Sequence, residues 1–177
     1  MCVCAISLEP AVVFPIFQSA TFAYEASDGE IDYHSIRYVR LNNTPTHNML
    51  HAKLALLEEG GEAVVTSSGM AAITTVLLTV LKSGDHLLLQ DGGVYGGVFT
   101  FAVHDLPKYG ITYDLYDATK PETLASKLKT NTKAIYAEAA TNPLGIVADH
   151  DALVQFAKKH KIISIIDSTL LTPVFFK

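Results

Sequence analysis

Apolar positions along the chain alternate between two spacings, and this alternation predicts its secondary structure. Runs of consecutive apolar residues, typical of strands buried in a parallel sheet, occupy 63–66, 86–90, 111–116, 132–138 and 162–166. Apolar residues at helical spacing cover about 45–59, 69–82, 121–128 and 150–161. Strands that alternate with helices in this way predict an α/β fold, with a mostly parallel sheet and helices on both faces.

Capping residues mark the ends of two of these helices. Thr44-Pro45 supplies an N-cap and a first helical residue, and Gly60-Gly61 ends that helix. Asp149 is placed to cap the last helix, which ends in the basic stretch 158–161. The helix over 69–82 is apolar nearly all round, so we expect it to be covered on both sides.

The first 44 residues show no sustained period, so we predict an N-terminal arm over 1–44 and a domain over 45–177. Near the end of the arm, an extended chain would place Tyr38 and Arg40 on one side. A hydroxyl beside a forked cation suits phosphate oxygens. On these residues alone, a surface strand with solvated side chains is the simpler interpretation.

Composition and charge narrow the classes of function. The chain has 177 residues, 49% of them hydrophobic, and a mean hydropathy of +0.27, enough for one domain or for part of a larger protein. A net charge of −5, with no basic cluster beyond 158–161, argues against nucleic-acid or anionic membrane partners. No apolar run could span a bilayer and residues 1–10 do not resemble a secretory signal, so we expect a cytoplasmic protein.

Metal binding is not indicated by the cysteines or histidines. Cys2 and Cys4 are too few and too close together to staple a fold or to complete a metal site. His47 and His51 have the i, i+4 spacing of helical ligands, but a solvated helix face explains them better because no third ligand is suggested.

The segment 63–73 contains the first candidate binding site. An apolar strand runs into Thr66-Ser67-Ser68-Gly69, where a new helix begins. Backbone N–H groups at a helix start have no partner within the helix and carry the positive end of its dipole, so they can hold a phosphate. An ordinary strand–turn–helix connection with a serine cap is the alternative.

Three further candidate side chains also follow predicted strands. Tyr95 lies on a glycine-rich turn without G-x-G-x-x-G spacing, and its ring could stack on a flat ligand or pack in the core. Asn142 either shapes a turn before a proline or aims its amide into a site, and Asp167 is either a ligand group or a cap. The carboxyl ends of parallel strands share one sheet edge, so these residues should converge there with Ser68-Gly69.

An anion-binding helix start, an aromatic ring and a buried carboxylate are the groups that pyridoxal 5′-phosphate (PLP) needs for its phosphate, its ring face and its protonated ring nitrogen. Over residues 14–176 the chain closely resembles the Cys/Met-metabolism (trans-sulfuration) family of PLP-dependent enzymes. That family includes cystathionine β- and γ-lyases, cystathionine γ-synthase, methionine γ-lyase and O-acylhomoserine sulfhydrylases. The resemblance implies the large domain of a fold-type-I PLP-dependent transferase.

The resemblance also implies which residues bind the cofactor phosphate. Ser68-Gly69-Met70 matches the S-G-M segment of the family, whose backbone and side chain hold the phosphate. Tyr38 and Arg40 match a Y-x-R element that reaches the phosphate of a neighbouring subunit.

Other matching residues would surround the cofactor ring. Tyr95, in VYGG, matches the tyrosine that stacks on the ring and is assigned a proton-transfer role, which makes it the implied catalytic residue. Glu138 and Asn142 match E-x-x-x-N-P, with Asn142 near the phenolic oxygen of the ring. Asp167 matches the aspartate of D-N-T that pairs with the pyridine nitrogen, and Thr169 matches its threonine.

Two features depart from the family pattern. Ser168 and Leu170 replace an asparagine and an aromatic residue beside Asp167. The family's S-x-T-K segment, which carries the Schiff-base lysine, does not occur in the sequence. We therefore expect the N-terminal fragment of a PLP-dependent enzyme that is inactive on its own, because it lacks the amine that holds the cofactor and acts as a base.

The resemblance implies elimination or replacement at a C–S bond as the reaction of the full-length protein. Its substrates would be sulfur-containing or O-acylated amino acids of the cystathionine, methionine, cysteine or O-acylhomoserine type, and its full-length form would be a homodimer or homotetramer. The alternative is a non-catalytic truncated paralogue that acts as a binding or assembly partner.

Overall fold

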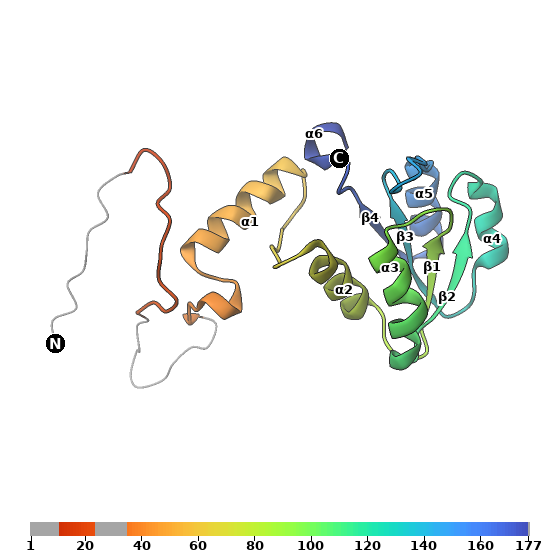
Figure 1. Ribbon diagram of the computed structural model, residues 1–177, viewed down its shortest axis with the longest axis horizontal. Helices are drawn as coiled ribbons and strands as arrows, with labels where there is room; N and C mark the ends of the chain where they lie inside the picture. The colour runs from red at the N-terminus through yellow and green to blue at the C-terminus, as the bar shows by residue number, and fades with distance from the viewer. Residues whose placement is uncertain (1–10, 24–34, 177) are drawn as a thin grey trace. The chain divides into compact units, whose positions relative to one another are not determined.

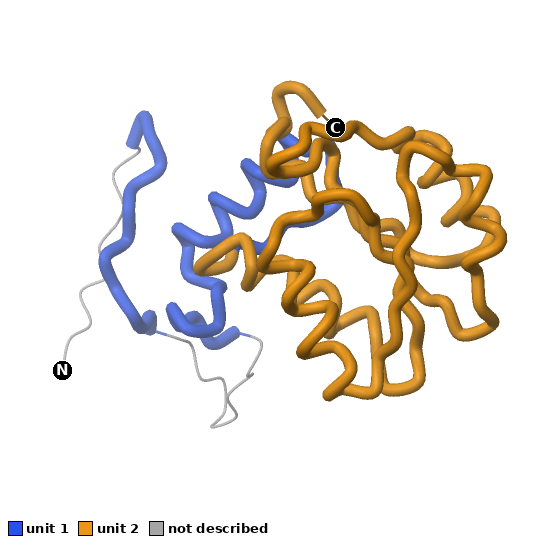
Figure 2. Tube along the Cα trace, turned by 45° about the vertical axis from the view of Figure 1, so that its right-hand side comes forward, with its two compact units in different colours: residues 1–65 blue, residues 66–177 orange. Residues whose placement is uncertain are grey.

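The computed structural model describes residues 11–23 and 35–176, and the chain divides into two compact units, 1–65 and 66–177 (Figures 1 and 2). The predicted end of the arm, at Thr44, lies inside the first unit, and the inter-subunit role of the arm stays a prediction. Cys2 and Cys4 lie outside the described residues.

The second unit is built on a four-stranded sheet that is parallel throughout, in the order β2-β1-β3-β4. Its strands are β1 (His86–Gln90), β2 (Thr112–Tyr116), β3 (Thr132–Glu138) and β4 (Ile163–Asp167). Its helices are α2 (Gly69–Val80), α3 (Gly96–Thr100), α4 (Leu124–Lys127), α5 (His150–His160) and α6 (Thr172–Phe175), with a 3-10 turn, η5 (Pro121–Thr123), before α4. The predicted α/β fold with a parallel sheet is confirmed.

The strand order places a topological switch between β1 and β3. The chain proceeds from β1 to β2 on one side, then returns to build β3 and β4 on the other. Loops after β1 and β3 therefore diverge at neighbouring strand ends, which is where open α/β sheets form ligand crevices.

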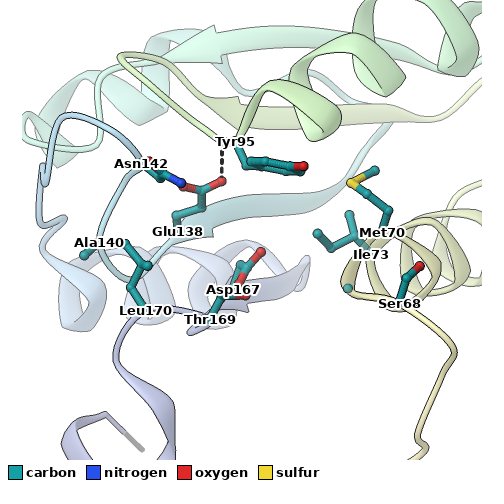
Figure 3. Close-up of a pocket in the computed structure, with 11 residues that line it drawn as sticks. Ser68, Met70, Ile73, Tyr95, Glu138, Ala140, Asn142, Asp167, Thr169 and Leu170 are labelled. Carbon is teal, nitrogen blue, oxygen red and sulfur yellow. Dashed lines mark hydrogen bonds between the residues drawn. The ribbon is translucent and has the colours of Figure 1, made fainter.

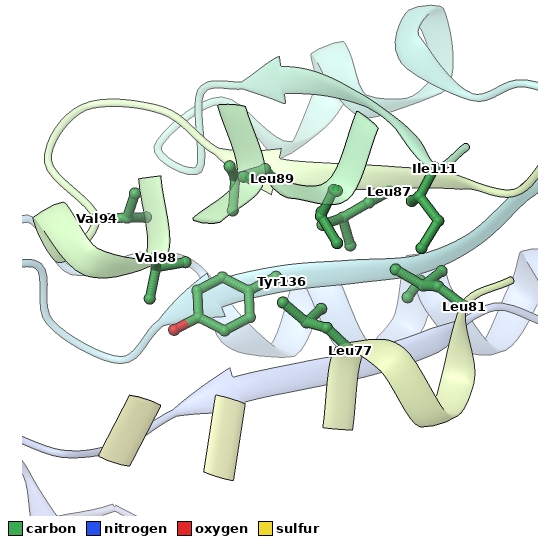
Figure 4. Close-up of a cluster of buried hydrophobic side chains, with 11 residues drawn as sticks. Leu77, Leu81, Leu87, Leu89, Val94, Val98, Ile111 and Tyr136 are labelled. Atoms are coloured by element: carbon green, nitrogen blue, oxygen red, sulfur yellow. The ribbon is translucent and has the colours of Figure 1, made fainter. Parts of the chain in front are cut away.

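Helices cover both faces of the sheet (Figure 1). Successive residues of a strand point to opposite faces, so Leu87 and Leu89 pack with α2 and α3 (Figure 4) while Leu88 packs with α4 and α5. All three leucines are fully buried. The apolar run of β1 is thus explained by burial on both faces, as predicted.

The strand expected at 63–66 does not form. These residues have no regular structure, pair with no strand of the described sheet, and leave Val64 71% exposed. Apolar residues form a strand only where a neighbouring strand supplies backbone partners. The carbonyl of Val65 instead accepts a hydrogen bond from the side-chain amide of Asn42 at 2.7 Å.

The expectation that the helix at 69–82 is covered on both sides is also wrong. In α2, Leu77 is fully buried, but Val76 and Leu78 are 40% and 39% exposed. The sheet and α3 provide a single apolar layer, so one side of the helix is buried and its other apolar side chains stay partly exposed.

A helical segment that the sequence did not predict follows β1. The helix α3 continues into a π-helical turn, η3 (Phe101–Asp105), and a 3-10 turn, η4 (Leu106–Tyr109). Two glycines at its start pointed away from a helix, because glycine has low helix propensity. The signal available in the sequence was the spacing of three apolar residues four apart, namely Val98, Ala102 and Leu106. All three are fully buried in the structure.

Both predicted caps are confirmed. In the first unit, which also contains a 3-10 turn, η2 (Val39–Leu41), Thr44 caps α1 (Pro45–Leu57), because its hydroxyl oxygen accepts the N–H of His47 at 3.4 Å. In the second unit, Asp149 caps α5, because its Oδ1 accepts the N–H of Ala152 at 2.9 Å.

Within the described ranges, none of the helices has the length and apolar character needed to cross a membrane. Among those residues there is also no group of three or more His, Cys, Asp or Glu side chains that could hold a metal ion.

Candidate functional site

A cavity of about 350 Å³ lies at the carboxyl ends of the strands in the second unit, facing the start of α2 (Figure 3). Eleven residues line it: Ser68, Gly69, Met70, Ile73, Tyr95, Glu138, Ala140, Asn142, Asp167, Thr169 and Leu170. Seven of the nine residues predicted to bind the cofactor are among them, namely Ser68, Gly69, Met70, Tyr95, Asn142, Asp167 and Thr169. The structure thus brings these residues together, while their individual roles stay predictions.

The structure of the start of α2 bears on both interpretations that the sequence left open. Ser68 caps the helix, since its Oγ accepts the N–H of Ala71 at 3.0 Å. The N–H groups of Gly69 and Met70 belong to the first turn and have no partner within the helix. The space beside the Cα of Gly69 is open, because a Cβ built there would meet no atom within 4 Å. The serine cap is therefore confirmed, the space beside the first turn is open, and anion binding there stays a prediction.

The ring of Tyr95 is available to a ligand rather than packed in the core. Tyr95 directly precedes α3 and is 50% exposed, so the core alternative is wrong. Its backbone N–H donates to Oε1 of Glu138 at 2.6 Å, and the N–H of Glu138 donates to Oε1 of Gln90 at 2.7 Å. The first bond ties the loop after β1 to the end of β3, and the second ties the end of β1 itself to the end of β3.

Gly97 allows the ring of Tyr95 to take this position. A Cβ at Gly97 would lie 2.7 Å from Cε1 of Tyr95 and 2.9 Å from Sδ of Met70. Any larger residue would have to displace the ring or the methionine. No individual role for this glycine was predicted from the sequence, because the contact depends on how the turn folds.

Asp167 ends β4, and both of its carboxylate oxygens accept hydrogen bonds. Oδ1 accepts the backbone N–H of Thr169 at 2.9 Å and also the hydroxyl of Thr169. Oδ2 accepts the hydroxyl of Tyr136 at 3.0 Å. Tyr136 was not predicted as a site residue, although its place two residues before Glu138 on the same strand was a signal that both share one face.

Two carboxylates stand side by side in the cavity. Glu138 and Asp167 are partners in the parallel register of β3 and β4, so their side chains emerge next to each other on one face. Burial raises the pKa of Glu138, the charge of Asp167 raises it further, and hydrogen bonds from the N–H groups of Tyr95 and Asn142 oppose the shift. No Lys, Arg or His is among the eleven lining residues. This end of the cavity therefore favours a cationic group.

Tyr38 and Arg40 belong to the first unit. The chain is extended at Tyr38 but turns into η2 directly after it, so the two residues do not share an extended segment. They nevertheless lie together, with the guanidinium carbon of Arg40 4.2 Å from the ring centroid of Tyr38. Their predicted contact with a phosphate of a neighbouring subunit stays a prediction.

Comparison with known proteins identifies the family. The sequence pattern of the Cys/Met metabolism PLP-dependent enzymes matches residues 7–177. The chain belongs to this family. It is 35% identical over 177 residues to an L-methionine gamma-lyase of Fusobacterium nucleatum subsp. polymorphum, covering 97% of this chain and 44% of that protein. It is 37% identical over 160 residues to the cystathionine beta-lyase MetC of Staphylococcus haemolyticus, covering 90% of this chain and 39% of that protein.

Solved structures agree with this assignment. The metY protein of Campylobacter jejuni, whose structure contains N′-pyridoxyl-lysine-5′-monophosphate, matches with a TM-score of 0.82 and 34% identity, over 93% of this chain and 41% of that one. Cystathionine gamma-lyase of Lactobacillus plantarum, complexed with L-serine, matches with a TM-score of 0.81 and 33% identity, over 90% of this chain and 40% of that one. The predicted fold-type-I PLP fold is confirmed, and the chain spans about half or less of the length of these relatives.

Proposed function

We propose that this chain forms the PLP-binding part of an enzyme that breaks or replaces C–S bonds in amino acids. The observation that carries the proposal is the charge arrangement of one cavity, with the N–H groups of a helix start at one end and a pair of carboxylates at the other. PLP has the matching groups, an anionic phosphate and a ring nitrogen that can carry a proton.

The residues present fit the cofactor. The N–H groups of Gly69 and Met70 and the hydroxyl of Ser68 would hold its phosphate, because the first turn of α2 attracts anions. Tyr95 would stack on the ring face, and Asp167 would hold the proton on the ring nitrogen. Bound there, PLP would supply an electron-withdrawing ring that stabilises negative charge on the carbon next to the amino group of the substrate.

The remaining roles follow from the family. Asn142 would contact the phenolic oxygen of the ring, and Tyr95 would also move a proton as the catalytic residue. Thr169 matches the family's threonine, and the donation of its N–H and hydroxyl to Oδ1 of Asp167 would orient that carboxylate. Tyr38 and Arg40 would bind the phosphate held by a second subunit in a homodimer or homotetramer. Relatives described as cystathionine beta-lyase and L-methionine gamma-lyase favour a sulfur-containing amino acid as the substrate. An O-acylated amino acid is the other substrate class that the family resemblance implies.

Binding of PLP to the purified 177-residue chain tests the first part of the proposal. Equilibrium dialysis should show saturable binding, which Asp167→Asn weakens by at least about tenfold, since hydrogen bonds between charged groups contribute roughly 1.5–3 kcal/mol. Asp151→Asn, an exposed carboxylate on α5 that does not line the cavity, is the matched control and should leave the affinity unchanged. Equal affinities for wild type and Asp167→Asn would contradict the proposal.

The coding sequence that follows codon 177 tests the reaction. An in-frame S-x-T-K segment would provide the lysine that C–S bond chemistry in this family requires. A stop codon with no such segment would contradict an enzymatic role and favour a non-catalytic binding or assembly partner.

A further inference from the structure

Tyr136 is an internal tyrosine whose hydroxyl reaches the candidate site. It lies in the middle of β3, is fully buried, and its ring packs in the core between the sheet and the helices α2 and α3 (Figure 4). A phenylalanine would fill the same apolar space. The hydroxyl therefore contributes something other than packing.

The hydroxyl of Tyr136 is directed to the carboxylate of Asp167. Tyr136 is the register partner of Ile165 on β4, and Ile165 is two residues before Asp167 on the same face. The ring therefore extends forward along the neighbouring strand, and its hydroxyl donates to Oδ2 of Asp167 at 3.0 Å. Burial, together with the charge of Asp167, raises the pKa of Tyr136, so this hydroxyl remains a donor at neutral pH.

These contacts restrict how Asp167 can serve a ligand. A carboxylate has about four acceptor positions, and the described residues fill three of them with two donors from Thr169 and one from Tyr136. Thr169 is exposed and lies on the turn after β4, whereas Tyr136 is fully buried and packed in the core. The core side of the carboxylate is therefore fixed by Tyr136 alone among the described residues.

We propose that Tyr136 is a positioning residue that fixes the carboxylate of Asp167 toward the cavity. This inference rests on the proposed function, because Asp167 is expected to hold the proton on the cofactor ring nitrogen. With Oδ2 anchored, one acceptor position stays directed at the ring site, and the carboxylate does not need to reorient when a ligand binds.

Tyr116 provides a matched control. It is also a buried strand tyrosine, 2% exposed, and its hydroxyl also makes one hydrogen bond, to the backbone carbonyl of Tyr136 at 3.1 Å. It packs on the opposite face of the sheet, with α4 and α5. Tyr116→Phe therefore removes a comparable buried hydroxyl without touching Asp167.

The first measurement needs no cofactor. In the ligand-free chain, the NMR chemical shift of the side-chain carboxyl carbon of Asp167 should change in Tyr136→Phe and stay unchanged in Tyr116→Phe. Circular dichroism confirms that both variants are folded. An unchanged shift in Tyr136→Phe, or an equal change in both variants, would overturn the proposal.

The second measurement is the affinity for PLP. Tyr136→Phe should weaken binding by about tenfold, the usual effect of losing a hydrogen bond to a charged group, while the affinity for inorganic phosphate, which needs only the start of α2, stays the same. In the Asp167→Asn background, Tyr136→Phe should have little further effect, because the two residues act together.

A wild-type affinity in Tyr136→Phe, or an equal loss in Tyr116→Phe, would overturn the proposal. If the wild-type chain does not bind PLP, the proposed function fails, and the carboxyl shift alone decides whether Tyr136 positions Asp167.

Discussion

Gly97 limits the size of the residue that can stand behind the ring of Tyr95. A methyl group at this position would approach both Cε1 of Tyr95 and Sδ of Met70 more closely than carbon atoms normally allow. The backbone of Gly97 itself is helical and needs no glycine, since it lies within α3 and is not among the positive-φ residues. The small size of Gly97 is therefore required by the side chains of the cavity and not by the helix.

Gly97→Ala should separate ligand binding from stability. Overpacking costs roughly 1–3 kcal/mol of stability where atoms cannot move. The half-exposed ring of Tyr95 can move, so the added methyl group should displace the ring from its position beside the ligand and lower the affinity for PLP by about tenfold. Helix propensity favours alanine over glycine by roughly 1 kcal/mol, so the free energy of unfolding should not fall. Equilibrium dialysis and urea unfolding measure the two quantities.

Gly96→Ala is the control for this prediction. A Cβ at Gly96 would meet no atom within 4 Å, and the residue lies in the same helix. It should retain the affinity of the wild type. If Gly96→Ala and Gly97→Ala weaken binding equally, the contact with Tyr95 is not the cause.

At the residue scale, site residues in turns and at the ends of elements could be predicted from the sequence. Tyr136, which reaches the site from within a strand, could not. Asn142 and Asp167 stand at or after the ends of strands, where chain order alone brings them to one edge. Ser68 also lines the cavity, but from the start of α2, because the strand predicted before it does not form. The contact between Tyr136 and Asp167 depends on the register of β3 against β4, which periodicity does not determine.

At the element scale, the helix α5 illustrates how a local signal supports the sheet. Asp149 accepts the N–H of Ala152 at the first turn, and the helix then packs Leu153 and Ala157 against the face of the sheet opposite α2 and α3. Both side chains are 1% exposed. The cap thus fixes where a core-forming helix begins.

Asp149→Ala should destabilise the chain by about 1 kcal/mol, the usual effect of losing an N-cap. Asp151→Ala, an acidic residue in the same first turn without the capping bond, should cost only a few tenths of a kcal/mol through the helix dipole. Urea unfolding of both variants measures the difference. Equal losses would show that charge near the helix start, and not the capping bond, stabilises α5.

Elements were predictable where local chemistry and tertiary packing agree. The strands β1 and β3 were found because burial on both faces requires consecutive apolar residues, as in Leu87 to Leu89. The segment 63–66 is also apolar but pairs with no strand of the described sheet, so it stays irregular. The helix α3 was missed because glycine lowers the local helix propensity, whereas the small size of Gly97 is required by its contacts with Tyr95 and Met70.

At the scale of the whole molecule, the free energy of unfolding depends on titratable groups buried at opposite ends of the sheet. At the cavity, the pKa of Glu138 is raised mainly by burial, so its contribution is present at low pH and is lost as pH rises through the pKa of the folded state. At the other end, His86 is fully buried at the start of β1. Its Nδ1 lies 2.8 Å from the hydroxyl of Thr132, and its Nε2 lies 3.4 Å from Oδ2 of Asp114.

The buried histidine should make the chain less stable in mild acid. Burial, and secondarily the charge of Lys129, lowers the pKa of His86 below its ordinary value of 6.5, although Asp114 partly offsets the shift. As pH falls below 6.5, the unfolded chain therefore binds a proton that the folded chain resists, and the free energy of unfolding should decrease by up to about 1.4 kcal/mol per pH unit.

Urea unfolding at several pH values between about 5 and 8, the range in which histidine titrates, measures how the free energy of unfolding changes with pH. His86→Gln should flatten the slope below pH 6.5 whatever its effect on absolute stability, while the exposed His104→Gln should leave it unchanged. A slope in His86→Gln equal to that of the wild type would show that groups other than His86 control the acid sensitivity of the fold.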